Sequence, residues 1–245
     1  MSRGTLRQVL LITDGYSNAG EDPVAIAALA KEEGLSVNVI GIVEEEEMSE
    51  RGIEEIRDIA ASGGGVSQIV YAKQLSQTVQ MVTKKAMSQT IYGVVNRELQ
   101  QILGSDKELE DLAPEKRGQL MEVVEDLGET MDLDIVILVD TSASMKNKLP
   151  MVQEALIDLS VSLRSRNGTN NFTLYSFPGK RSDTDKLISW TTSFETLSGA
   201  FKKIAVSGVT PTGPAIQEAI RIFRKRAKKK GPGEDERFDL RETGM

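Results

Sequence analysis

The chain has 245 residues, 39% of them hydrophobic, which is enough for one large domain or two small ones. It has neither cysteine nor histidine, which excludes disulfide frameworks, thiolate metal sites, zinc hydrolases and serine–histidine–aspartate triads. A net charge of −7 and a pI near 5.0 argue against nucleic acid as the main partner, because phosphate binding needs a basic surface.

The N-terminal region has no pattern of a signal peptide or a membrane span. Its longest apolar run, Val9 to Ile12, is far shorter than either requires. The absence of cysteine suits a reducing compartment. We therefore expect a cytoplasmic protein that does not associate with membranes.

The first half of the chain alternates strand-like and helix-like segments. Short, β-branched apolar runs predict buried central strands, and helical periodicity appears between and after them. Asp22 and Pro23 are typical of a helix start. The predicted strands are Gln8–Thr13, Val37–Val43 and Val66–Tyr71, and helical apolar sets fall at Ile53–Ala60, Leu75–Ala86 and Ile91–Ile102.

A polar and acidic connector, residues 105–132, separates the two halves. Pro114 interrupts it, but apolar residues from Leu120 to Met131 still fall on one helical face. The connector is therefore predicted to be partly helical.

The second half repeats the alternation of strands and helices. Asp134–Asp140 predicts a buried strand, and Asn171–Phe177 and Lys186–Thr192, separated by a loop with proline and glycine, predict a hairpin. Helices are predicted near Val152–Leu163, Leu197–Ile204 and Ile216–Phe223, and a disordered charged tail from Lys228. The fold class is α/β: a mostly parallel sheet with helices on both faces and one antiparallel edge strand.

Oxygen-bearing side chains follow the strand Asp134–Asp140. Asp140, Ser142 and Ser144 alternate in the stretch DTSASM, at the carboxyl end of a strand, where open α/β sheets place their ligands. A carboxylate and two hydroxyls suit Mg²⁺ or Mn²⁺ better than soft metals. The alternative is that these residues only cap the following helix.

Two further stretches carry matching residues. SGVTPTGPAI, residues 207–216, is a hydroxyl-bearing loop that leads into a helix, and LITDG ends in a second strand-end aspartate, Asp14. Together the three motifs resemble the metal-ion-dependent adhesion site of von Willebrand factor type A domains. Residues Ile59–Val79 also resemble the last strand and helix of that family.

The resemblance implies a metal site and a partner. Its metal residues would be Asp140, Ser142, Ser144, Thr210 and Asp14, with Mg²⁺ or Mn²⁺ as the ion. The resemblance also implies that an acidic side chain of another protein completes the coordination shell, because two carboxylates roughly neutralise the ion and leave a position open.

The order of the motifs departs from the family. There the aspartate of the T-D-G motif comes last, whereas Asp14 comes first here, which predicts a circularly permuted domain. Residues 1–104 would be its C-terminal half, 105–132 the connector, 133–227 its N-terminal half and 228–245 the tail. Exposed termini that lie close together tolerate such permutation. The alternative is a swapped homodimer, in which each half is completed by another copy.

Other functions stay open at this stage. One is a metal-dependent phosphoryl-transfer or hydrolytic enzyme that uses Asp140 and Asp14, although a phosphate loop and an evident general base are missing. Another is an accessory subunit of an ATPase machine, which some bacterial members of the family resemble. We expect a binding module rather than an enzyme.

Two runs of charged residues and two aromatic residues are interpreted as having structural roles rather than binding roles. Glu44–Glu47 is interpreted as a solvated loop on the rim of the metal site, and Arg224–Lys230 as cations favoured at a helix C-terminus. Phe177 and Trp190 are interpreted as core residues.

Overall fold

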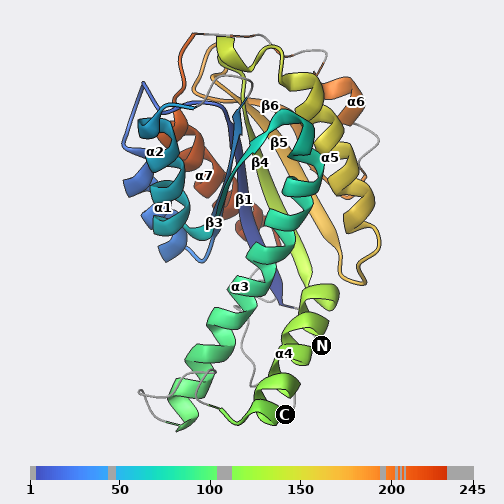
Figure 1. Cartoon of the computed structure of the whole chain (residues 1–245). Coiled ribbons are helices and arrows are strands. Elements are labelled where there is room, and N and C mark those ends of the chain that lie inside the picture. Colours follow the sequence, from blue (N-terminus) through green and yellow to red (C-terminus); the bar gives the residue numbers. More distant parts are fainter. Residues whose placement is uncertain are drawn as a thin grey trace.

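A computed structural model gives the architecture, and it describes residues 4–43, 48–103, 112–193, 197–201, 204, 206 and 208–230. One sheet runs through the molecule in the order β3-β2-β1-β4-β5-β6 (Figure 1). All neighbouring strands are parallel except β5 and β6. The α/β prediction with one antiparallel edge is confirmed. The strands are β1 (Thr5–Thr13), β2 (Ser36–Val43), β3 (Gly64–Tyr71), β4 (Asp132–Asp140), β5 (Asn170–Phe177) and β6 (Asp185–Thr191).

The two central strands come from opposite ends of the chain. β1 pairs with β4 from Thr5 opposite Asp132 to Ile12 opposite Val139. Nearly every residue of both strands is buried, because helices cover both faces. The two halves therefore form one sheet within one chain.

The prediction that Val66–Tyr71 is a buried central strand is wrong. β3 pairs only with β2 and lies at the edge of the sheet, where Val66 and Val70 are buried while Gly64 and Tyr71 are exposed. β3 contacts helices on both faces, but it pairs on one side only and its open side leaves several residues in contact with solvent, so it needs fewer apolar residues than a central strand.

Helices pack on both faces of the sheet (Figure 1). One face carries α1 (Pro23–Glu32), α2 (Glu50–Ser62) and α7 (Thr212–Lys230), and their apolar residues form one core with Val9, Leu11 and Leu138. The opposite face carries α3 (Leu75–Leu103), α5 (Leu149–Leu163) and α6 (Leu197–Ala200), packed on Leu10 and Ile137 among others. The Asp22 carboxylate caps α1 by accepting a hydrogen bond from the Val24 N–H, as predicted.

The apolar sets from Leu75 to Ile102 belong to one helix. α3 has 29 residues, about 43 Å at 1.5 Å per residue, and it extends beyond the sheet to pack beside α4 (Pro114–Thr130) (Figure 1). Val124 of α4 is buried in the core that α3 lines. Pro114 begins α4 rather than ending a helix, which suits its position in the first turn.

The basic run is partly buried against the sheet. Arg226 donates to Asp134 at 2.5 and 3.0 Å, and its guanidinium lies 4.0 Å from the centre of the Trp190 ring. Only 16% of the Arg226 side chain is exposed. This run is therefore more than a solvated helix end.

α7 continues to Lys230, so residues 228–230 are helical and do not belong to the predicted disordered tail.

The two aromatic residues of the hairpin pack as predicted. Phe177 is fully buried, and Trp190 is half-buried against Phe223.

The acidic run Glu44–Glu47 and the rest of the predicted tail lie outside the described residues. Within the described ranges, no helix is both long and apolar enough to span a bilayer.

Candidate metal centre

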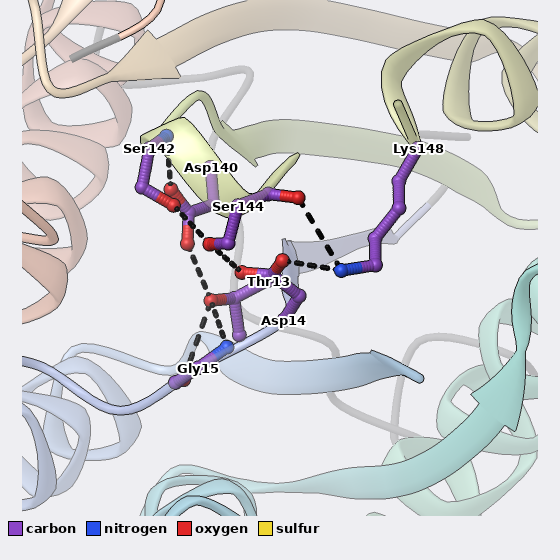
Figure 2. Close-up of polar contacts among 7 residues, drawn as sticks. All are labelled: Thr13, Asp14, Gly15, Asp140, Ser142, Ser144 and Lys148. Atoms are coloured by element: carbon purple, nitrogen blue, oxygen red, sulfur yellow. Dashed lines mark hydrogen bonds and ion pairs between the residues drawn. The ribbon is translucent and has the colours of Figure 1, made fainter. Parts of the chain in front are cut away.

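The candidate site lies where β1 and β4 end side by side. Because the two strands are parallel neighbours, their carboxyl ends meet at one edge of the sheet, and the loops that follow them face each other. Asp14 directly follows β1, and Asp140 is the last residue of β4. Figure 2 shows the two loops joined by a chain of polar contacts.

Asp140 is fully buried and both of its oxygens accept hydrogen bonds. The Thr13 hydroxyl donates to Oδ2 at 2.6 Å, and the Ser142 N–H donates to Oδ1 at 2.7 Å. The second bond closes a tight turn after β4, as aspartate often does at a strand end. Thr13 therefore connects β1 directly to β4 at the site.

Burial dominates the electrostatics of Asp140. It raises the pKa of the Asp140 carboxyl to about 6, because the charged form loses hydration. Hydrogen bonds from Thr13 and Ser142 oppose this rise, and the negative charge of Asp14 adds to it. A cation at this place would favour the ionised carboxylate.

Two serine hydroxyls link the Asp140 loop to Asp14. The Ser142 and Ser144 hydroxyls are 3.1 Å apart, and the Ser144 hydroxyl donates to Asp14 Oδ1 at 2.8 Å (Figure 2). Ser142 lies at the start of a short 3₁₀ turn, Ala143–Met145, which brings Ser144 beside it. Four of the five predicted residues are thus connected, directly or through the loop backbone.

Lys148 also belongs to the cluster, and the sequence analysis did not select it. Its ammonium lies 2.6 Å from Asp14 Oδ2 and 3.4 Å from the Ser144 carbonyl oxygen. Lys148 is four residues after Ser144 and is the last residue of the turn that leads from the 3₁₀ turn Ala143–Met145 into α5. Four residues is also the spacing of neighbours on one side of a helix. Lys146, two residues earlier, is exposed. The spacing from Ser144 was the only sequence signal that separated these two lysines.

The fifth predicted residue, Thr210, is held by the loop that follows Asp14. Its N–H donates to the Asn18 Oδ1 atom at 2.8 Å, and its carbonyl accepts from the Asn18 N–H and the Ser17 hydroxyl, both at 3.2 Å. Thr210 is buried. Across the described contacts, no hydrogen bond joins its hydroxyl to the other four residues. Asn18 and Ser17 fix this loop, although no motif pointed to them.

Two glycines allow the start of α7 to approach the loop after Asp14. A Cβ atom on Gly213 would lie 2.0 Å from the Glu21 carbonyl oxygen, and one on Gly20, whose φ is +82°, would lie 2.3 Å from Pro214. Neither position accommodates a larger side chain without movement. This close contact sets where Thr210 stands relative to Asp14.

The donors fit a hard divalent cation. Two carboxylates and three hydroxyls supply only oxygen, as Mg²⁺ and Mn²⁺ prefer. Among the described residues, no group of three or more histidine, cysteine, aspartate or glutamate side chains is placed to hold a metal. The oxygen donors that the side chains of this site offer are therefore mainly the two carboxylates and the serine and threonine hydroxyls.

Comparison with known proteins identifies the domain. A sequence model of the von Willebrand factor type A domain matches residues 135–234, which include Asp140, Ser142, Ser144 and Thr210. The chain is also 57% identical over 245 residues, the full length of both proteins, to the uncharacterized protein YabS of Bacillus subtilis (strain 168). The chain belongs to the same family as YabS and contains a von Willebrand factor type A domain. The predicted von Willebrand factor type A domain is therefore confirmed.

A solved structure agrees with the fold of this chain. A crystal structure of an uncharacterized protein from Alicyclobacillus acidocaldarius has a TM-score of 0.84 at 41% identity, covering 93% of this chain and 97% of that one. A structure of proximal thread matrix protein 1 from the mussel byssus is described as having a zinc-occupied MIDAS motif, where MIDAS stands for metal-ion-dependent adhesion site. That structure has a TM-score of 0.30 at 18% identity and covers 94% of this chain and 48% of that one, which is too weak a likeness to bear on this site.

Proposed function

We propose that this chain is a binding module that uses a divalent cation to hold an acidic side chain of another protein. The observation that carries the proposal is the contact chain from Asp140 through Ser142 and Ser144 to Asp14. It brings two carboxylates, 126 positions apart in the sequence, to one cluster of hydroxyls. This arrangement suits one shared cation.

Each residue has a role in this proposal. Ser142 and Ser144 coordinate the ion directly, and Thr210 joins them when a partner is engaged. Asp140 and Asp14 act mainly through water and through the hydroxyls that they hold. The ion supplies an open coordination position, which a carboxylate from the partner fills. Mg²⁺ or Mn²⁺ is the proposed ion, given the hard oxygen donors.

The proposal includes a permuted chain order. Two observations support it: β1, from the start of the chain, lies at the centre of the sheet beside β4, and the family match covers only residues 135–234. Residues 1–104 then provide the C-terminal half of the domain, and the connector joins it to the N-terminal half. The pairing of β1 with β4 within one chain supports a domain that closes without an exchange of halves between two copies.

The proposal assigns no catalysis to the site. Asp140, whose pKa of about 6 would suit a general base, is fully buried with both oxygens engaged, so it is not positioned to reach a substrate. Incubation with p-nitrophenyl phosphate and Mg²⁺ is expected to give no turnover. Turnover that disappears in Asp140→Ala would favour the enzyme alternative.

Calorimetry with Mg²⁺ and Mn²⁺ tests the metal site. We expect the wild type to bind one ion and the Asp14→Ala and Asp140→Ala variants to lose this binding. Asp58→Ala, which removes an exposed carboxylate of α2, is the matched control and should bind like the wild type. No binding by the wild type, or equal binding by Asp140→Ala, would contradict the proposal.

Affinity capture tests the binding of partners. The immobilised wild type is expected to retain a set of proteins in Mg²⁺ and to release it in EDTA. Asp14→Ala and Asp140→Ala should lose the same proteins, whereas Asp58→Ala should keep them. Partners retained equally in EDTA would show that binding does not use the metal.

A further inference from the structure

A lysine ammonium lies inside the candidate metal centre. Only 10% of the Lys148 side chain and 2% of the Asp14 side chain are exposed, and their charged atoms are 2.6 Å apart. Such a buried pair is retained only when each charge compensates the other. Lys148 is therefore the internal counter-ion of Asp14.

The ammonium and a metal ion would compete for the same carboxylate. Lys148 holds Asp14 Oδ2, and Asp14 Oδ1 accepts from Ser144, a proposed metal ligand (Figure 2). An ion held by the serine hydroxyls would stand close to both the carboxylate and the ammonium. Like charges this close repel each other strongly in a site with little water.

The net charge of the cluster also indicates that Lys148 weakens the attraction of a divalent cation. Asp14 and Asp140, when ionised, together with Lys148 leave one net negative charge in the cluster, whereas the two carboxylates alone would leave two. A divalent cation is attracted less by the first arrangement than by the second. The ammonium must also leave Asp14 if this carboxylate is to serve the metal fully.

We propose that Lys148 competes with the divalent cation for Asp14 and thereby sets the metal affinity of the site. This inference rests on the proposed metal-dependent function. In the metal-free protein Lys148 stabilises Asp14, and the metal displaces it. The site then binds its ion more weakly than its oxygen donors alone would allow.

The test is Mn²⁺ calorimetry on the full chain with Lys148→Met, Lys148→Gln and Lys146→Met. Both Lys148 variants are expected to bind Mn²⁺ between about tenfold and a hundredfold more tightly than the wild type. Lys146→Met removes an exposed positive charge from the same loop and should keep the wild-type affinity. Lys148→Gln retains a hydrogen-bond donor, so it provides a folded variant if Lys148→Met unfolds.

Thermal unfolding in EDTA gives a second readout. Lys148→Met should melt at a lower temperature than the wild type, because Asp14 loses its counter-ion, and saturating Mn²⁺ should raise its melting temperature by more than that of the wild type. Lys146→Met should match the wild type in both conditions.

The outcomes separate this inference from the proposed function. If the wild type binds Mn²⁺ and the Lys148 variants bind it equally or more weakly, competition is disproved and the metal site stands. If only the Lys148 variants bind, competition is supported and metal use by the wild type is contradicted. If no variant binds, both proposals fail.

Discussion

Asp140 is a buried acid whose pKa lies well above its ordinary value in water. Burial raises its pKa from an ordinary value of 3.8 to about 6. The folded protein therefore keeps a proton that the unfolded chain has already released between these two values. The contribution of Asp140 to the stability of the metal-free protein should be greatest below about pH 4, fall as pH rises to about 6, and stay lower above it.

Urea unfolding in EDTA from pH 4 to pH 7.5 measures this effect. Titration of Asp140 should account for a loss of up to about 3 kcal/mol across the window, since each pKa unit corresponds to 1.36 kcal/mol. Asp140→Asn has no titrating group at this position and should lack this part of the decline. Parallel curves for the two proteins would show that Asp140 titrates normally in the fold.

At the residue scale the sequence predicted acids and hydroxyls but not their counter-charges. Asp14, Asp140, Ser142 and Ser144 were found because each lies in a motif at the end of a strand or just after it. Lys148 was missed because a lysine near a helix start usually points into solvent, as Lys146 does. Apart from the spacing of Lys148 from Ser144, only the packing of the 3₁₀ turn Ala143–Met145 beside α5 distinguishes the two.

At the scale of elements, the start of α7 is held against the loop after Asp14. Gly213 approaches the Glu21 carbonyl so closely that a Cβ atom would overlap it. Gly213→Ala should therefore shift α7 and Thr210, with a loss of about 1–3 kcal/mol of unfolding free energy and weaker Mn²⁺ binding.

Gly93→Ala is the control for this substitution. Gly93 lies in α3 with no atom outside its own helix within 4 Å of an added Cβ, so alanine should leave metal binding unchanged and stabilise the helix slightly. Urea unfolding and Mn²⁺ calorimetry on both variants provide the comparison. A Gly213→Ala variant with wild-type stability and affinity would show that this contact does not position Thr210.

Sequence periodicity predicted the elements well where burial was uniform. β1, β2 and β4 were predicted because helices cover both of their faces, which favours continuous apolar runs. β3 was placed wrongly in the sheet because its apolar ending resembles such a run, although it lies at the edge of the sheet and several of its residues are partly or fully exposed. The ion pair of Arg226 with Asp134 was missed because it joins residues 92 positions apart.

At the scale of the molecule, the two halves should unfold together. β1 and β4 are neighbours in the centre of the sheet, so neither half can bury its apolar strands without the other. Urea transitions followed by Trp190 fluorescence, which reports the second half, and by far-ultraviolet circular dichroism should therefore coincide. Two separated transitions would contradict a single domain built from both halves.

The order of the motifs predicted that the two halves of the chain share one site, but it did not predict how their strands pair. Asp14 at the start of the chain predicted a site shared with Asp140. No sequence pattern fixed the pairing of β1 with β4 or the contact of Thr13 with Asp140, because both depend on packing between distant segments.

Anomalous scattering from crystals soaked in Mn²⁺ tests the central claim most directly. One strong peak is expected beside the Ser142 and Ser144 hydroxyls, between Asp14 and Asp140, and it should be absent from Asp140→Ala crystals. A wild-type map without density there, or with Mn²⁺ bound only elsewhere, would contradict the claim that these two aspartates share one cation.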